Sequence, residues 1–293
     1  MTSPKAILFS LLGAVAAIFC TVWAGDLVAS KRRRTPNAFH FVVGFVTDFF
    51  DTLGIGSYAT TTSLFRLRRA VADEEIPGTL NVGHALPTIA QAFIYITIVK
   101  VEMKTLALLI GASVLGAWLG AGVVTRLPRR RIQIGMGLAL LAAVALILGG
   151  LLHVLPAGGS ATQLDGLPLY AALVGNFWFG ALMTIGIGAY APIMMMVSLL
   201  GMNPKAAFPI MMGSCAFLMP IAGVRFIGSG KYDPRAALGL AIAGTPAVLL
   251  AAFIITEMPL DAVRWLVVIV VLYVAVSMLR AARVERREFR SGE

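Results

Sequence analysis

Nine hydrophobic stretches, most of them close to the length that crosses a bilayer, constrain the fold of this chain. A helix needs about 20 apolar residues to span the hydrocarbon core, and lipid cannot satisfy a bare backbone, so helices are expected throughout. The first stretch is too long for the core of a signal peptide and is predicted to be a helix. Seven stretches have the pattern of plain spans, at 6–29, 78–99, 104–125, 132–153, 206–227, 235–256 and 263–281, and two more lie at 40–65 and 170–200.

The stretches at 40–65 and 170–200 each contain one copy of a glycine-rich octapeptide. The copies run from Thr52 to Ala59 (TLGIGSYA) and from Thr184 to Ala191 (TIGIGAYA), and they begin 132 residues apart. Their glycines break a membrane-buried helix and free backbone N–H and C=O groups, which then need protein or water around them. Broken helices at matching positions of two halves are typical of secondary transporters.

Composition places the chain in the membrane and accounts for its charge. Of 293 residues 59% are hydrophobic and 13% are charged, and the mean hydropathy is +0.88, which excludes a soluble globule. The net charge of +10 does not indicate a nucleic-acid partner, because the basic residues cluster beside the hydrophobic stretches, as the positive-inside rule describes. The clusters lie at 31–34, 66–69, 126–131 and 280–290.

The basic clusters favour two re-entrant hairpins. If 40–65 crossed the bilayer, the clusters at 31–34 and 66–69 would lie on opposite sides; if it turned back at its glycines, both would be cytoplasmic. Each limb of about 12 residues reaches roughly 18 Å, enough to approach the midplane of a core about 30 Å thick. With 170–200 as a second hairpin, the N-terminus is external and the C-terminus cytoplasmic. The alternative is nine plain spans with one breach of the rule.

The duplication extends beyond the octapeptides. Pro77 matches Pro209, and the loop at 100–104 matches the one at 231–235 with one residue of slippage. Each unit has a hairpin and three spans, an odd number, so the second unit is inverted and the two breaks should meet near the midplane. The predicted fold is an all-α integral membrane protein of about seven transmembrane helices and two re-entrant hairpins. The predicted divisions are an extra helix at 1–35, a first repeat at 36–153, an external linker at 154–169, an inverted second repeat at 170–282 and a basic cytoplasmic tail at 283–293.

The glycine turns are predicted to form an anion site. The limb after each turn begins with unpaired amides and the positive end of a helix dipole, and glycine allows an oxyanion to approach closely. Nearby hydroxyls can donate to the same anion, or bond back to their own helix. The candidate residues around the two turns are Thr52, Gly54, Gly56, Ser57, Tyr58, Thr184, Gly186, Gly188 and Tyr190.

Other polar residues at membrane depth complete the predicted site. Asp48 and Asp51 lie on one helical face and are candidates for coupling to a proton or cation, or for capping near the interface. Asn81 and His84 begin a polar stripe that continues to Gln91, with His84 either a titrating group or a neutral hydrogen-bonding one. In the second half, Ser214 and Arg225 are candidates, Arg225 either for an anion or for lipid phosphate, and Asn176 is a further one.

Several kinds of chemistry are not expected. The sequence has no ATP-binding loop, no nucleophile elbow and no metal-ligand spacing, so neither a cofactor nor a metal is predicted. Cys20 and Cys215 lie in different hydrophobic stretches and are predicted to be packing residues. Small residues at 111–113 and 116–122 suit close helix contacts, either within the chain or between the copies of a homodimer.

From Phe41 to Arg280, the duplicated glycine-rich hairpins in a chain of this length resemble the TauE/SafE family of membrane permeases. The resemblance implies export of a small sulfur anion, sulfite or an organosulfonate such as sulfoacetate, across the plasma membrane. The Asp48-Phe-Phe-Asp51 segment looks particular to this chain. The alternatives are an uptake permease for a related anion and a membrane enzyme or assembly factor without transport.

Overall fold

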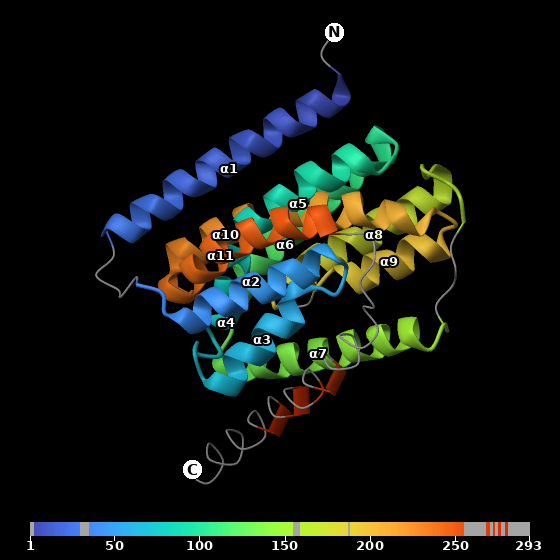
Figure 1. Ribbon diagram of the computed structural model, residues 1–293. Coiled ribbons are helices and arrows are strands. Elements are labelled where there is room, and N and C mark those ends of the chain that lie inside the picture. Colours follow the sequence, from blue (N-terminus) through green and yellow to red (C-terminus); the bar gives the residue numbers. More distant parts are fainter. Residues whose placement is uncertain are drawn as a thin grey trace.

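The computed structural model describes residues 3–29, 35–154, 159–186 and 188–254, and positions 268, 269, 272, 275, 276, 279 and 280. The described residues form helices joined by short loops, with no β-strand among them (Figure 1). The predicted span at 263–281 lies largely outside the described residues. The elements are α1 Pro4–Ala29, α2 Ala38–Thr52, α3 Ser57–Arg68, α4 Ile76–Gly83, α5 Ala85–Ile98, α6 Met103–Val124, α7 Arg129–Leu151, α8 Gly166–Met183, α9 Tyr190–Leu199, a short 3-10 turn at Pro204–Ala206, α10 Ala207–Ser229 and α11 Pro234–Ile254.

Within the described residues, six helices are long and apolar enough to cross a membrane: α1, α6, α7, α8, α10 and α11. Their apolar side chains face outward as well as inward, as expected where lipid replaces water. The chain is therefore a multi-pass, all-helical membrane protein. Helix α8 is longer than the limb of about 12 residues that the sequence predicts for a hairpin.

Both octapeptides break helices, as predicted. The first break separates α2 from α3, with Gly54 and Gly56 at φ +88°, and the second separates α8 from α9, with Gly186 at φ +102°. Residues other than glycine rarely adopt these backbone angles. Glycine therefore lets the chain leave one helix and start the next within a few residues. Helices α2 and α3 contact each other across the break, as do α8 and α9.

The span predicted at 78–99 is divided into two helices, α4 and α5, which meet at His84. Pro87 explains the division, because its ring lacks an N–H and clashes with the carbonyl four residues earlier, at Gly83. The chain continues from His84, whose N–H still bonds to the Leu80 carbonyl at 3.0 Å. The irregularity leaves the His84 side chain at the junction, in the centre of the molecule.

Glycines bring two pairs of helices into close backbone contact. Helix α2 packs along α11, where an added β-carbon on Gly44 would lie 2.7 Å from the Cα of Leu240. Helix α6 packs along α8, where a β-carbon on Gly116 would lie 1.9 Å from the Phe177 carbonyl oxygen. Small residues at 113–122 therefore serve contacts within the chain. Helix α10, buried along most of its length, contacts α4, α5 and α6.

Polar contacts tie the loops together at two opposite ends of the bundle. At one end the Asp73 carboxylate accepts from Arg66 at 2.5 Å and from Gln133 at 2.8 Å, and Asp233 N–H donates to Thr79 at 2.8 Å. At the other end, backbone bonds join the loop before α6 to the loop before α8, and that loop to residues 201–203. Figure 1 shows the first end at the left of the view and the second at the right.

Candidate functional site

A small pocket lies where the two glycine breaks come together. Gly56 belongs to the first break and Gly188 to the second, and a β-carbon on Gly188 would lie 3.7 Å from the Cβ of Tyr58. The prediction that the breaks approach each other is thus reflected in the lining of one pocket. The lining residues are Asp51, Gly56, Ser57, Tyr58, Thr88, Met183, Gly188, Ala189, Met211, Met212, Cys215 and Met219.

Asp51 occupies the N-terminus of α3. Its Oδ1 accepts the Ser57 N–H at 2.7 Å, and its Oδ2 accepts from the Gln91 amide at 2.9 Å. A carboxylate at the positive end of a helix is stabilised by the dipole and the free amides. The first turn was predicted to offer its amides to a substrate anion, but in the structure the protein's own carboxylate takes the amide of Ser57.

Asp48 and His84 form a buried pair beside this carboxylate. His84 Nδ1 lies 2.8 Å from Asp48 Oδ1, and its Nε2 lies 3.1 Å from the Thr61 hydroxyl. The tautomer with its proton on Nδ1 satisfies both contacts, donating to Asp48 and accepting from Thr61. All three side chains are fully buried, and Gly244 of α11 leaves the room for the second carboxylate oxygen of Asp48. A hydroxyl, an imidazole and a carboxylate therefore form one hydrogen-bonded chain buried inside the helix bundle.

Two hydroxyls at the pocket have no hydrogen-bond partner among the described residues. They belong to Tyr58 and Thr88, and both are buried. Leaving a buried hydroxyl unpaired costs about 1–3 kcal/mol, so such groups indicate a ligand or water. Tyr58 was predicted as a site residue. Thr88 was not, although it lies four residues after His84 and three before Gln91, on the predicted polar stripe.

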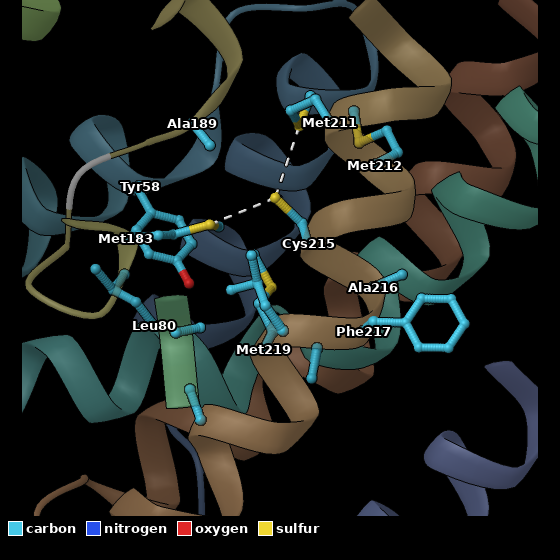
Figure 2. Close-up of a cluster of buried hydrophobic side chains, with 14 of the residues drawn as sticks. Tyr58, Leu80, Met183, Ala189, Met211, Met212, Cys215, Ala216, Phe217 and Met219 are labelled. Atoms are coloured by element: carbon cyan, nitrogen blue, oxygen red, sulfur yellow. Dashed lines mark hydrogen bonds between the residues drawn. The ribbon is translucent and has the colours of Figure 1, made fainter. Parts of the chain in front are cut away.

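The opposite wall of the pocket is made of sulfur-containing side chains. Met211, Cys215 and Met219 follow one another every four residues along α10, and Met183 ends α8. Figure 2 shows Cys215 between Met183 and Met211, with the Tyr58 ring beside Met183. None of these sulfur residues was predicted as a site residue, and Cys215 was expected only to pack. Their spacing of four along α10 is also the ordinary pattern of a buried apolar helix, so it does not distinguish a site from a packed core.

The remaining candidates lie away from the pocket lining. Thr52 and Thr184 donate back to their own helices, the alternative kept open for such hydroxyls, and Asn81 donates to the Pro77 carbonyl at 2.8 Å. Ser214 accepts from Asn176 at 3.0 Å in the packed interior. Gly54 and Gly186 shape the turns without lining the pocket. Tyr190 starts α9, and its side chain is outside the described set.

Arg225 is not placed to bind an anion in this pocket. Its guanidinium lies 3.7 Å from the centre of the Trp118 ring on α6, and it is not among the lining residues. A guanidinium stacked on an indole is a cation–π contact that holds α10 against α6. Cys20, on α1, is exposed, whereas Cys215, on α10, is buried.

Six helices of membrane-spanning length and two helix breaks that meet at one pocket, all within the described residues, define a multi-pass helical membrane protein. The family model described as sulfite exporter TauE/SafE matches residues 2–148, half of the chain. The chain belongs to the TauE/SafE sulfite exporter family. The matched part includes α2 to α6, and with them Asp48, Asp51, Tyr58 and His84. No curated protein and no solved structure matches the chain.

Proposed function

We propose that this protein exports a small sulfur oxyanion, sulfite or an organosulfonate such as sulfoacetate, across the plasma membrane by alternating access. Family membership supports a membrane exporter of sulfur anions. The observation that carries the proposal is the pocket between the two helix breaks, where the buried hydroxyls of Tyr58 and Thr88 are left for a ligand. In this proposal the pocket is the substrate site near the bilayer midplane.

The anion binds at the start of α9. Gly188 and Ala189 line the pocket just before this helix, and among the described residues no side chain accepts a hydrogen bond from its first amides. The first amides of a helix lack partners within the helix and point toward an anion. The corresponding end of α3 is already neutralised by Asp51. Among the described lining residues there is no Lys or Arg, so amides and hydroxyls provide the binding.

The two halves are related as an inverted repeat, comprising residues 36–153 and 170–282. Matching by sequence pairs α2 with α8 and α6 with α11. A two-fold relation then requires that the contact between α2 and α11 reappear as one between α8 and α6, and these are two closely packed helix pairs. The exchange of partners supports the proposal.

The two broken elements are re-entrant hairpins that enter from opposite faces. Helix α2 starts beside Gly239 near the beginning of α11, reaches Gly244 with Asp48, and α3 returns to the same end of the bundle, where Arg66 binds Asp73. Helix α8 starts at the other end, where Leu164 N–H bonds to Thr105, and α9 returns there. The basic clusters at 66–69 and 126–131 belong to the first end, which we assign to the cytoplasm with the C-terminus, leaving the N-terminus external.

Asp48, Asp51 and His84 couple transport to a proton. A charge at the bilayer centre costs about 2.5–3.5 kcal/mol, so buried carboxylates are retained for function rather than packing. Asp51 lies at the pocket and would repel an anion while ionised, whereas its protonation removes that repulsion. The anion and a proton then occupy the site together, with the His84–Asp48 pair next to it.

Flux in proteoliposomes tests the function against its alternatives. Export predicts saturable flux of sulfite or sulfoacetate that responds to a proton gradient, whereas an enzyme or assembly factor predicts no flux with any anion. An uptake permease for a related anion would carry that anion in preference to both.

Two glycine substitutions test whether the transported anion passes through this pocket. Gly188→Leu fills it without backbone strain and should abolish flux in a folded protein, because the nearest atom to a new β-carbon belongs to Tyr58 at 3.7 Å. Gly111→Leu, where a β-carbon meets nothing within 4 Å, is the matched control and should retain flux. Equal flux from both variants would show that the transport pathway does not pass through this pocket.

A further inference from the structure

The sulfur wall of the pocket is also arranged as a set of metal ligands. Cys215 Sγ lies 3.4 Å from Met183 Sδ and 3.8 Å from Met211 Sδ (Figure 2). Met212 and Met219 line the same pocket. Methionines of a hydrophobic core usually fill space, but here the thioethers converge on a thiol at the edge of an empty volume.

The sulfur separations suit a shared ion. A metal–thiolate bond is about 2.3 Å long, and at that distance from one ion the two measured separations subtend angles of about 95° and about 111°. These lie in the range of trigonal and tetrahedral sites. Methionine has three rotatable bonds, so Met183 and Met211 can adjust around an ion without moving their helices.

Ligand type and charge select the metal. Thiolate and thioether ligands favour Cu(I) over harder cations. Cys215 supplies one negative charge after its thiol proton leaves to solvent, and the thioethers are neutral, so a monovalent ion gives an uncharged complex. A divalent ion would leave a net positive charge inside the membrane, which is costly. Both oxygens of Asp51 are already hydrogen-bonded, to Ser57 and Gln91.

We propose that Cys215, Met183 and Met211 form a binding site for a soft monovalent cation, Cu(I), on the sulfur wall of the central pocket. Met212 and Met219, which line the same pocket, are candidates for a further ligand. The site goes beyond anion export, and it stands or falls whether or not the protein transports sulfite.

Silver binding to the purified full chain tests the site, because Ag(I) has the same preference for sulfur and is not oxidised in air. Titration against a coloured chelator should give one tightly bound ion per chain. Cys215→Ser should weaken binding by at least about 100-fold, since it removes the anionic ligand. Met183→Leu and Met211→Leu conserve volume and should each weaken it about tenfold.

Two matched controls are available in the chain. Cys20→Ser removes the other cysteine, which is exposed on α1, and Met195→Leu removes a methionine outside the pocket lining; both should bind silver like the unaltered chain. X-ray absorption of the complex should show sulfur neighbours alone. Wild-type affinity in Cys215→Ser, or nitrogen and oxygen neighbours, would overturn the site. If Cys215→Ser does not elute as a folded protein, unchanged affinity in both leucine variants overturns it instead.

Discussion

The N-termini of α3 and α9 lie in the two copies of the glycine-rich octapeptide but carry opposite chemistry. At α3 the carboxylate of Asp51 accepts the Ser57 amide; 132 residues later the matching residue is Met183, and within the described part of the chain no side chain accepts from the first amides of α9. One helix end is therefore already neutralised by the protein and the other is open to the pocket. A symmetric scaffold can in this way hold an anion at one end and a proton-binding group at the other.

The same contrast extends along the paired helices. The polar residues of the first half, Asp48, His84 and Gln91, match Gly180, Ala216 and Gly223 in the second. At these three positions the first half buries a hydrogen-bonding side chain, and the second half has only glycine or alanine. Hence both octapeptides break a helix, whereas a few side chains that differ between the matched positions set the chemistry of the pocket.

Adding a carboxylate at the open helix end should have the largest effect. Met183→Asp places a negative charge before α9, where the substrate anion is proposed to bind, and should abolish sulfite flux by repulsion. Met183→Asn has nearly the same shape without the charge and should keep measurable flux. Transport by both variants in proteoliposomes makes the comparison, and equal activities would show that the anion does not bind at this helix end.

Removing the carboxylate at the other end should separate binding from coupling. Asp51→Asn keeps the hydrogen bond from Ser57 but cannot exchange a proton, so accumulation driven by a proton gradient should fall to that of empty liposomes. Exchange of labelled for unlabelled substrate should continue, because it needs no net proton movement. Asp165→Asn, on an exposed loop, serves as control. Gradient-driven accumulation by Asp51→Asn would remove the carboxylate from the coupling step.

Parts of this arrangement can be predicted from the sequence, and the reasons differ from residue to residue. The octapeptides predict both breaks, since glycine at positive φ is a local requirement of the backbone. The polar stripe from His84 to Gln91 follows from helical periodicity. The sulfur wall could not be recognised, because methionine every four residues on an apolar helix is the ordinary pattern of a core.

Helical periodicity in the sequence did not predict which side chains from different helices contact each other. Asp48 and Asp51 were predicted as a pair on one helical face, yet Asp48 binds His84 and Asp51 binds Ser57 and Gln91. Arg225 had the charge of an anion ligand, but its stacking on Trp118 depends on how α6 and α10 pack. Side-chain partners that come from different helices depend on the tertiary arrangement, which periodicity does not specify.

The two glycine-mediated helix contacts should respond differently to an added methyl group. At Gly180 a β-carbon would lie 2.0 Å from the Ser113 carbonyl oxygen, a backbone atom that cannot move aside, and Gly180→Ala should cost about 1–3 kcal/mol of stability. At Gly244 the same group would lie 2.0 Å from the Asp48 carboxylate, a side chain that can turn away. Gly244→Ala should therefore reduce the transport rate strongly and the thermal stability only slightly. Thermal unfolding in detergent and flux assays measure the two effects, and the reverse ranking would contradict this account.

The smallest expected effect concerns a capping residue that the two halves share. Glu102 precedes α6 and Asp233 precedes α11, 131 residues later, and the Glu102 carboxylate accepts from the Thr105 hydroxyl and N–H at 2.6 and 2.7 Å. The hydrogen bond from the Thr105 hydroxyl holds the pKa of Glu102 below its usual value.

A lowered pKa stabilises the fold above the unfolded pKa of about 4.3, and this contribution is lost as the pH falls through the folded pKa. Glu102→Gln should therefore lower the melting temperature at pH 7 but not at about pH 3. The loss in free energy of unfolding at pH 7 should be less than about 1 kcal/mol, because the group is near solvent. Asp165→Asn, at the start of α8 where the side chain makes no capping bond, should change neither value. A pH-independent difference for Glu102→Gln would mean that the charge of the cap contributes nothing.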